Sequence, residues 1–231
     1  MFGKGFSLQT LLNTLTEIKP SAVAMGTHHY VQLAESDELQ LVDPEDLESV
    51  KLLLPAGAAV PSSCELAIKA KMKNLEGVLN SYGQTESGVI TCGTSPLHLG
   101  TVLPTVKVKI EDPDTGKRCK PNQLGEICVK SPYLMQKYLQ RPRETEEYFD
   151  FEGFGHTGDL GYYDNEGNIF FVDRIKELIK YNNNHVAPTE IEDILQRHEG
   201  VQECLVFGKK DPKVQELISA VVIRKPKSKV V

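Results

Sequence analysis

Apolar residues recur at helical spacing close to the start of the chain. They are three or four positions apart, at Leu8, Leu11, Leu12, Leu15 and Ile18. Residues at this spacing share one face of a helix, so the pattern predicts an amphipathic helix that packs against the rest of the protein. Ser7 is placed to cap its first turn, and the Lys-Pro pair at 19–20 is placed to end it.

Short apolar runs then alternate with further helical patterns over the first hundred residues. In chain order we expect a strand at 21–26, a helix at 27–34, a strand at 50–54, a helix at 61–73 and a strand at 78–80. This alternation is typical of a parallel sheet covered by helices. Such sheets hold ligands at the carboxyl ends of their strands, which is where the polar stretch 82–86 would lie.

From about residue 105 the pattern changes to short alternating strands separated by turn residues. One strand is predicted at 106–110. A hairpin is predicted from strands at 160–163 and 169–172, which the turn 164–167 connects. This part of the chain therefore predicts a small β-barrel or an antiparallel sheet.

A small α+β unit is predicted after Arg174. Its strands fall near 177–181 and 204–207. Between them a helix opens with Pro188, which suits the first helical position, and stops at Gly200.

Taken together, these elements predict a chain of mixed α/β and α+β class. Its expected parts are the end of a parallel α/β sheet domain (1–100), a small β-barrel subdomain (101–173) and the start of a small α+β C-terminal domain (174–231). With 231 residues, the chain is long enough to bury a sizeable core.

Charge and cysteine content exclude several classes of protein. The formal net charge is -6 and the lysines and arginines are scattered, which argues against a nucleic-acid-binding surface. Five widely spaced cysteines without a Cys-x-x-Cys pair favour reduced thiols in an intracellular protein over a disulfide framework or a zinc site. No apolar run is long enough to span a membrane, and no targeting signal is visible.

The polar stretch 82–86 combines residue types that a core does not need. Tyr82 offers a ring on which another ring can stack, and Gly83 permits a backbone angle that other residues avoid. Thr85 can donate a hydrogen bond to an anion, and Glu86 is a hard oxygen ligand for Mg²⁺. The combination indicates a binding site.

Three later motifs follow this stretch in a specific order. They are His-Thr-Gly-Asp-Leu at 156–160, Phe-Val-Asp-Arg-Ile-Lys at 171–176 and Ile-Lys-Tyr at 179–181. With Tyr-Gly-Gln-Thr-Glu at 82–86, they resemble the adenylate-forming superfamily of acyl-CoA synthetases, 4-coumarate-CoA ligases and beetle luciferases. The resemblance covers nearly the whole chain and implies that the chain is incomplete. Residues 1–173 would then be the last part of the family's AMP-binding N-terminal domain, and 174–231 part of its C-terminal domain.

The resemblance implies roles for residues of the first part of the chain. Tyr82 would stack on adenine, Thr85 would bond the α-phosphate, and Glu86 would hold Mg²⁺. Gly83 belongs to the same motif. Gly57 and Ala58 would form the other wall of the adenine slot, although a simple strand-to-helix turn also explains such small residues.

The later motifs carry the remaining implied roles. Asp159 would accept hydrogen bonds from both ribose hydroxyls, and Arg174 would reach the same nucleotide; the alternative is a structural Asp-Arg pair at a turn. Lys176 would be the hinge about which the C-terminal domain rotates. Lys180 would approach the adenylate and support the transfer step. For either lysine, a solvated surface position is the alternative.

Three features of the family pattern are absent or changed. The chain has no Ser/Thr/Gly-rich phosphate loop ending in Pro-Lys-Gly and no C-terminal Gly-Lys segment. The family's Lys-Gly-aromatic-Gln is replaced by Asn-Asn-Asn-His at 182–185. Because asparagine tolerates left-handed backbone angles, we expect the turn itself to persist.

The resemblance implies the reaction ATP + carboxylic acid + CoA giving acyl-CoA + AMP + pyrophosphate. The cofactors would be ATP/AMP and Mg²⁺, with CoA as co-substrate and a fatty or aromatic acid as substrate. We expect this chain alone to be inactive. The alternatives are a short non-catalytic relative that binds a nucleotide or partner, and a luciferase-like oxygenase. The family implies a peroxisomal location, with the cytoplasm as the alternative, and the oligomeric state stays open.

Overall fold

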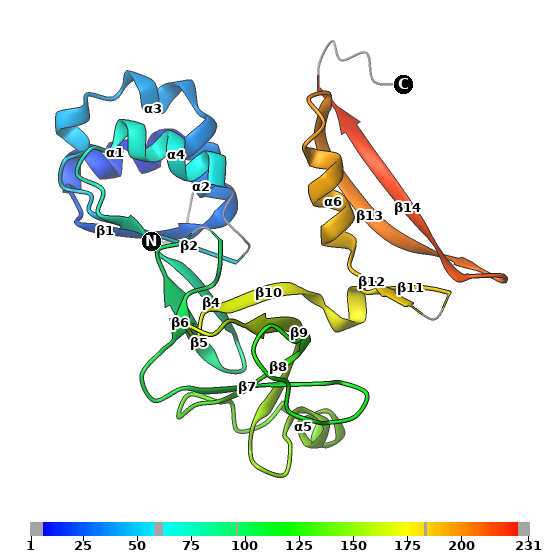
Figure 1. Ribbon diagram of the computed structural model, residues 1–231. Helices are drawn as coiled ribbons and strands as arrows, with labels where there is room; N and C mark the ends of the chain where they lie inside the picture. The colour runs from blue at the N-terminus through cyan, green and yellow to red at the C-terminus, as the bar shows by residue number, and fades with distance from the viewer. Residues whose placement is uncertain (1–6, 58–61, 96, 183, 226–231) are drawn as a thin grey trace. The chain divides into compact units, whose positions relative to one another are not determined.

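The computed structural model describes residues 7–57, 62–95, 97–182 and 184–225. The chain divides into two units, each a separate cluster of internal contacts (Figure 1). The first unit consists of Met1–Lys107, Lys130–Tyr138 and Asn165–Phe170, and the second unit consists of Val108–Val129, Leu139–Asp164 and Phe171–Val231.

The helix α1 (Leu8–Ile18) of the first unit confirms the predicted amphipathic helix. The hydroxyl oxygen of Ser7 accepts a hydrogen bond from the backbone N–H of Thr10 at 3.1 Å and so caps the first turn. Lys19 ends the helix in the left-handed conformation, with φ at 51° and its N–H bonded to the carbonyl of Leu15. The Leu15 side chain is fully buried, so this face of the helix packs into the core.

The predicted parallel sheet is present in the first unit, with the order β1-β2-β3. Its strands, which pair in parallel, are β1 (Ala22–Gly26), β2 (Leu52–Ala56) and β3 (Gly77–Val78). The connecting segments are α2 (Thr27–Glu35), α3 (Asp37–Leu41), η1 (Pro44–Leu47) and α4 (Ser62–Lys71). The strand predicted from residue 50 begins later, because the N–H of Val50 bonds the carbonyl of Leu47 and extends the preceding turn.

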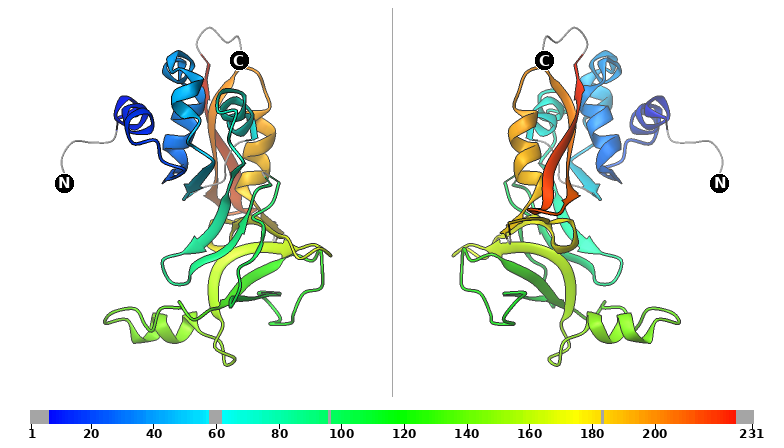
Figure 2. Two further views of the ribbon diagram at one scale, coloured as in Figure 1. Left: turned by 90° about the vertical axis from the view of Figure 1, so that its left-hand side faces the viewer. Right: turned by 90° about the vertical axis from the view of Figure 1, so that its right-hand side faces the viewer.

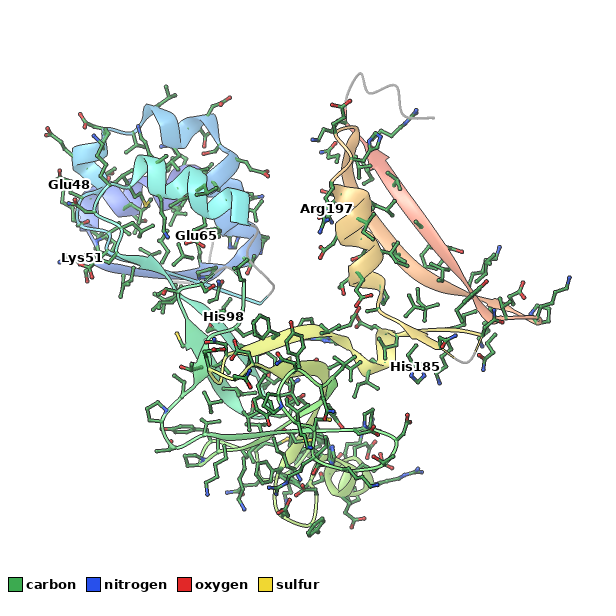
Figure 3. The ribbon with its side chains drawn as sticks, viewed as in Figure 1. Glu48, Lys51, Glu65, His98, His185 and Arg197 are labelled. Carbon is green, nitrogen blue, oxygen red and sulfur yellow. The ribbon has the colours of Figure 1, made fainter. Side chains whose placement is uncertain are left out.

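Apolar side chains from these helices and strands form one core in the first unit. Its fully buried members include Tyr30, Leu33, Leu39, Leu47, Leu53 and Ile68. Glu65 of α4, labelled in Figure 3, is also buried, and its carboxylate pairs with the ammonium of Lys69 at 2.5 Å. Each large apolar side chain in such a core contributes roughly 1.5–3 kcal/mol relative to an exposed position.

An antiparallel sheet with the order β4-β5-β6 completes the first unit. Its strands are β4 (Asn80–Gln84), β5 (Gly88–Gly93) and β6 (Thr101–Val102). The single strand predicted at 78–80 is wrong, because two strands meet there. Val78 ends the parallel pairing with β2, and Asn80 begins the antiparallel pairing with β5.

The second unit carries most of a four-stranded sheet with the order β10-β9-β8-β7. Its strands are β7 (Lys107–Glu111), β8 (Gly125–Lys130), β9 (Gly155–Tyr163) and β10 (Ile169–Arg174), and the helix α5 (Pro142–Tyr148) precedes β9. Over the described residues β7 and β10 are the two edges, so the sheet is open and the predicted β-barrel is wrong. Four strands are too few to close, since even small barrels have about five or more.

The predicted α+β unit is present at the end of the second unit, with more strand than expected. After η2 (Ile175–Glu177) its strand order is β12-β11-β14-β13. The strands are β11 (Ile179–Tyr181), β12 (Asn184–Val186), β13 (Val201–Asp211) and β14 (Gln215–Arg224). The helix α6 (Pro188–Gln196) packs against β13 (Figure 2). Strand β14 was not predicted, because the turn before it lacks the Asn-Gly or Asp-Gly signal of a tight hairpin.

The helices of the described segments are short. The longest, α1, has 11 residues, whereas a helix that crosses a bilayer needs about 20. None of them is long and apolar enough to do so.

Candidate functional site

The predicted site residues fall into two groups, one in each unit. The first unit holds Gly57, Tyr82, Gly83, Thr85 and Glu86, and the second unit holds Asp159, Arg174, Lys176 and Lys180. Within the first unit, four of these residues share one hairpin. Within the second unit, Asp159 and Arg174 form an ion pair.

The stretch 82–86 spans the end of β4 and the turn that follows it. Tyr82 and Gly83 belong to the strand itself and pair with β5, whereas Thr85 and Glu86 lie in the turn. The stretch is therefore part strand and part turn. Because the hairpin is tight, the ladder with β5 continues almost to the turn.

Gly83 is required by close packing between strands. It is not one of the glycines with positive φ, whereas Gly88 on the opposite strand has a φ of 69°. A Cβ atom at Gly83 would lie 2.3 Å from the carbonyl oxygen of Gly88 and 2.8 Å from the Cα atom of Val89. The expected reason for this glycine, an unusual backbone angle, is thus corrected: any side chain would push β4 and β5 apart.

Glu86 is held by a distant tyrosine of the first unit. The hydroxyl of Tyr138 donates a hydrogen bond to Oε1 of Glu86 at 2.7 Å, and the N–H of Met135 donates to the Glu86 carbonyl at 2.7 Å. Burial and the hydrogen bond to Glu86 raise the pKa of Tyr138 to about 12, so the phenol remains a donor at neutral pH. Sequence analysis missed Tyr138, which lies 52 positions from Glu86, because no local pattern connects the two.

The predicted adenine wall is described only in part. Gly57 follows β2, is exposed and has a φ of 105°, a conformation that favours glycine. A Cβ atom there would meet no described atom within 4 Å, so a flat ligand could approach this backbone. Ala58 lies outside the described residues.

Asp159 lies on a bulge of β9 in the second unit. Between two regular pairs with β8, residues 157–159 oppose the single residue Ile127. Gly158 permits the bulge with a φ of 72°. The hydroxyl of Thr157 donates to the carbonyl of Ile127 at 2.6 Å and accepts from the N–H of Asp159 at 3.1 Å, which closes the bulge.

The predicted pairing of Asp159 with Arg174 is present. Nε of Arg174, at the end of β10, lies 3.6 Å from Oδ1 of Asp159. Asp159 is only 3% exposed, whereas the arginine side chain is about half exposed and also lies 3.9 Å from Glu177. A buried carboxylate needs such a partner, because desolvating it alone costs several kcal/mol. Both earlier interpretations, a ribose-binding pair and a structural Asp-Arg pair, fit this geometry.

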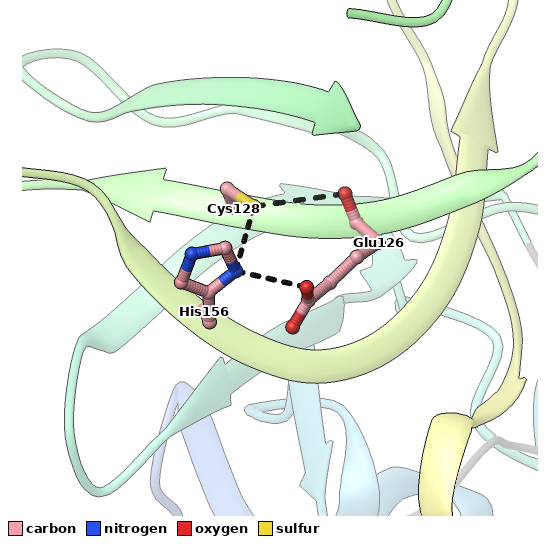
Figure 4. Close-up of side chains that lie close together, drawn as sticks. All are labelled: Glu126, Cys128 and His156. Atoms are coloured by element: carbon pink, nitrogen blue, oxygen red, sulfur yellow. Dashed lines mark hydrogen bonds and ion pairs between the residues drawn. The ribbon is translucent and has the colours of Figure 1, made fainter. Parts of the chain in front are cut away.

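Glu126 is the supporting residue that sequence analysis missed. Its Oε1 accepts a hydrogen bond from the N–H of Gly158 at 2.9 Å, and its Oε2 lies 2.8 Å from Nδ1 of His156 (Figure 4). One carboxylate therefore holds two residues of the motif that carries Asp159. The two partners of Glu126 are 30 and 32 positions away, so no local pattern connects them to it.

The predicted hinge residue Lys176 is exposed in η2. Three residues before it, Asp173 is buried, and its Oδ2 accepts hydrogen bonds from the hydroxyl of Thr189 at 3.0 Å and the N–H of Thr189 at 3.3 Å. Asp173 thus ties the end of β10 to the first turn of α6. Sequence analysis placed Asp173 in a motif but gave it no role.

Lys180 is exposed on β11 of the second unit. Its N–H donates to Oε2 of Glu216 at 2.7 Å. It lines a shallow surface depression of 410 Å³ together with Lys210, Asp211, Pro212, Gln215 and Glu216. An ammonium group at such a surface can reach a ligand without crossing other side chains.

Within the altered segment 182–185, Asn182 follows β11, and Asn184 and His185 belong to β12. Asn182 has a φ of 49°, so the prediction that asparagine supports a left-handed turn here is confirmed at that residue. His185, labelled in Figure 3, pairs with Lys180 across the hairpin. Asn183 lies outside the described residues.

The fold and the two groups of residues define a mixed α/β protein with charged and polar residues on a hairpin and a sheet bulge. Two family models match the chain: "AMP-binding enzyme" over residues 2–139 and "AMP-binding enzyme C-terminal domain" over residues 190–231. The chain belongs to the AMP-binding enzyme family.

Curated relatives include a luciferase and a ligase-like protein. The chain is 39% identical over 223 residues to luciferin 4-monooxygenase of Nipponoluciola cruciata. This match covers 94% of this chain and 40% of that protein. It is 41% identical over 200 residues to 4-coumarate–CoA ligase-like 1 of Arabidopsis thaliana, which covers 81% of this chain and 37% of that protein. The chain thus spans about two fifths of the length of these relatives.

Two of the solved structures that the chain resembles hold a nucleotide. ATP-bound MatB from Rhodopseudomonas palustris matches with a TM-score of 0.89 and 28% identity, over 100% of this chain and 45% of that one. The o-succinylbenzoate coenzyme A synthetase of Bacillus subtilis in complex with AMP matches with a TM-score of 0.80 and 29% identity, over 97% of this chain and 45% of that one.

Proposed function

We propose that this chain supplies the nucleotide-holding part of an AMP-forming acid–thiol ligase. Such an enzyme transfers the AMP part of ATP to a carboxylic acid and releases pyrophosphate. It then transfers the acyl group from AMP to CoA. The observation that carries the proposal is the bulge 157–159, which buries the carboxylate of Asp159 beside Arg174 in a chain of the AMP-binding enzyme family. The 4-coumarate–CoA ligase-like relative supports an aromatic acid as substrate, with fatty acids as the other class.

Asp159 and Arg174 would act on the ribose. A carboxylate accepts hydrogen bonds and both ribose hydroxyls donate them, so two charge-assisted bonds can form. The half-exposed guanidinium of Arg174 has more N–H groups than its pairing with Asp159 uses, and these can face the same nucleotide. Glu126 would not touch the nucleotide; it would hold the bulge in place through Gly158.

The hairpin of the first unit would act on adenine, phosphate and metal. Tyr82 would stack on adenine opposite the wall that contains Gly57 and Ala58, and Thr85 in the exposed turn would donate to the α-phosphate. Glu86 fits a Mg²⁺ ligand, because it is a hard oxygen donor, is only partly buried and is oriented by Tyr138. Bound Mg²⁺ would neutralise charge on the phosphates.

The region after Arg174 would move between the two half-reactions. Lys176 would be the hinge between an N-terminal part, 1–173, and a C-terminal part, 174–231. Lys180 would then approach the adenylate during transfer to CoA. Because the segment 182–185 differs from the ligase pattern, we propose that adenylate formation tolerates it better than thioester formation does.

A luciferase-like oxygenase is the second candidate function. The 39% identity to a luciferin 4-monooxygenase favours it, and adenylation would be common to both activities. Light emission with luciferin, ATP and Mg²⁺ would separate it from the ligase. The five free cysteines support an intracellular location, which we propose to be the peroxisome by resemblance or else the cytoplasm.

Nucleotide binding by the 231-residue chain tests the proposal. Isothermal titration with AMP should give saturable binding, and Asp159→Asn should weaken it by about 1.5–3 kcal/mol, because the acceptor of the ribose hydroxyls loses its charge and one of its two oxygens. Asp114→Asn, in the exposed turn 112–116, is the matched control and should leave the affinity unchanged. Equal affinity of wild type and Asp159→Asn would remove Asp159 from the site.

A pyrophosphate-release assay separates binding from catalysis. With ATP, Mg²⁺ and fatty or cinnamic acids, we expect no turnover by this chain, because its sequence lacks the Ser/Thr/Gly-rich phosphate loop. Turnover by the pure chain would show that its own residues suffice for catalysis.

A further inference from the structure

Glu126, Cys128 and His156 lie together on the neighbouring strands β8 and β9 of the second unit (Figure 4). Sγ of Cys128 is 3.6 Å from Nδ1 of His156, and that nitrogen is 2.8 Å from Oε2 of Glu126. One ligand atom from each side chain lies within 4.8 Å of the other two. Cys128 and His156 are direct partners in the strand register, so the sheet itself fixes their approach.

A thiol, an imidazole and a carboxylate are the ligand types that Zn²⁺ takes in proteins. Bonds of about 2.0–2.3 Å in a tetrahedron place ligand atoms about 3.3–3.7 Å apart. The observed 3.6 Å between Cys128 and His156 already meets this spacing. The contact between His156 and Glu126 would open by roughly 0.5 Å to admit an ion. His156 is about one third exposed, so its edge provides access from solvent.

The same three side chains do not form a nucleophilic cysteine–histidine pair. Cys128 is fully buried. This burial, and to a smaller extent the negative charges of Glu126 and Glu111, raise the pKa of its thiol. A nucleophile requires the thiolate, which this surrounding disfavours. A divalent cation reverses the balance, because a coordinated thiol is deprotonated.

A second acidic cluster of the second unit shows the contrast. Glu111, Asp150 and Glu152 also bring their carboxylates together. The ammonium of Lys109 already lies among them, 2.6 Å from Glu111 and 3.0 Å from Glu152. The ammonium of Lys109 therefore supplies the cation for this cluster, whereas the carboxylate of Glu126 lies beside an imidazole and a neutral thiol.

We propose that Glu126, Cys128 and His156 form a binding site for a borderline-soft divalent cation such as Zn²⁺, with water as a fourth ligand. An ionised carboxylate only accepts hydrogen bonds, so in the ion-free protein Nδ1 of His156 carries the proton and donates it to Glu126. On binding, the ring proton moves to Nε2 and the thiol proton of Cys128 leaves for solvent. One proton is thus released for each cation.

The cation would also stiffen the bulge of β9. It would bind Oε2 of Glu126, whereas Oε1 keeps its hydrogen bond from Gly158 at 2.9 Å. The carboxylate would then be fixed from both sides. The site therefore couples the presence of a metal to the segment that carries Asp159.

Cadmium titration of the metal-free 231-residue chain tests the proposal, because a thiolate bound to Cd²⁺ gives an ultraviolet charge-transfer band. We expect one equivalent of Cd²⁺ to bind, with the band and with release of one proton, measured by calorimetry in two buffers of different ionisation enthalpy. Cys128→Ser should lose the band and the proton release and bind at least about tenfold more weakly. Cys204→Ser is the matched control, because that thiol, although only partly buried, also lies beside acidic residues, and it should behave as wild type.

A second variant keeps the test decisive if Cys128→Ser does not fold. Glu126→Gln retains the shape of the side chain and the thiol, so it should keep the charge-transfer band while weakening Cd²⁺ binding about tenfold. Competition with Zn²⁺ should remove the band from the wild-type chain. The proposal is overturned if the wild-type chain shows no stoichiometric band, or if Cys204→Ser loses the band instead.

Discussion

The two units differ in the charged side chains that they bury beside their apolar ones. In the first unit the core is apolar, and within the described ranges Glu65 is the one buried charged residue. The second unit buries Lys109, Asp159 and Asp173, and each of them meets a partner of complementary chemistry. The sheet of the second unit thus buries charged residues in addition to apolar ones such as Ile127 and Leu160.

This contrast shows which side chains must be placed most accurately. An apolar core tolerates changes of shape as long as its volume is kept, but a buried charge requires partners at hydrogen-bond distance. Lys109 illustrates the point: its ammonium pairs with Asp150, Glu111 and Glu152 and lies 4.7 Å from the ring centre of Phe154. The candidate ribose ligand Asp159 is one of the buried charged residues of the second unit.

The largest expected effect comes from removing the buried cation. Lys109→Met should lower the free energy of unfolding by about 3–5 kcal/mol, because three carboxylates would be left together without their partner. Lys107→Met, at the exposed start of the same strand, should change it by less than about 0.5 kcal/mol. Chemical denaturation measures both, and equal values for the two variants would contradict the view that the buried charge organises this sheet.

A cavity in the core of the first unit should have the second-largest effect on stability. Leu53→Ala removes a fully buried side chain of β2 and should cost about 2–5 kcal/mol, from lost burial and from the cavity left behind. Leu205→Ala is the matched leucine of the second unit; it is 61% exposed and should cost less than about 0.5 kcal/mol. A large loss at Leu205 would mean that this face of β13 is covered in solution.

Adding one carbon to the hairpin of the first unit should have a smaller effect. Gly83→Ala should destabilise the protein by about 1–3 kcal/mol, because the new Cβ would collide with the backbone of Gly88 and Val89. The control Val89→Ala changes a half-exposed side chain beside the contact without adding an atom to it. Thermal unfolding compares the two, and a neutral Gly83→Ala would show that the strands separate at little cost.

Acid should weaken the charge network of the second unit gradually. Burial raises the pKa of Asp150, but hydrogen bonds from Lys109 and from backbone N–H groups outweigh it and hold the pKa below its usual value. Hydrogen bonds from Arg118 and Lys109 lower the pKa of Glu152 in the same way. Their contribution to stability is therefore complete above the unfolded-state pKa values, about 4, and is lost as the pH falls through the lower folded-state values.

Denaturation between pH 7 and pH 3 measures this loss. Lys109→Met should flatten the decline of the unfolding free energy, because the two carboxylates lose the donor that they share. The same decline in wild type and variant would assign the acid sensitivity to other groups. Alkaline pH is not expected to have this effect, because the hydrogen bonds that Lys109 donates to its carboxylate partners outweigh burial and raise the pKa of Lys109.

Much of the fold was predictable because its signals are local. The spacing of Leu12 and Leu15 predicted α1, Ser7 caps it as its residue type suggests, and the helix ends before the Lys-Pro pair at 19–20 as predicted. The left-handed turn at Asn182 followed from the side chain alone. Each of these features depends on residues within a few positions of one another.

The candidate site depended much more on tertiary structure. The sequence indicated Glu86 and Asp159 as site residues, but Tyr138 and Glu126 support them from 52 and more than 30 positions away. The cysteines lack the spacing of a zinc site, yet the register of β8 and β9 brings Cys128 beside His156.

Residue type and spacing thus predicted α1, α2, α4 and α6, several of the strands and the motifs that mark the family. Tertiary structure decided that the four-stranded sheet stays open, that Gly83 is needed for space, and which carboxylates share Lys109. The physical reason is range: backbone preferences and periodicity act within one element, whereas hydrogen bonds and ion pairs between strands form only after the chain has brought distant residues together.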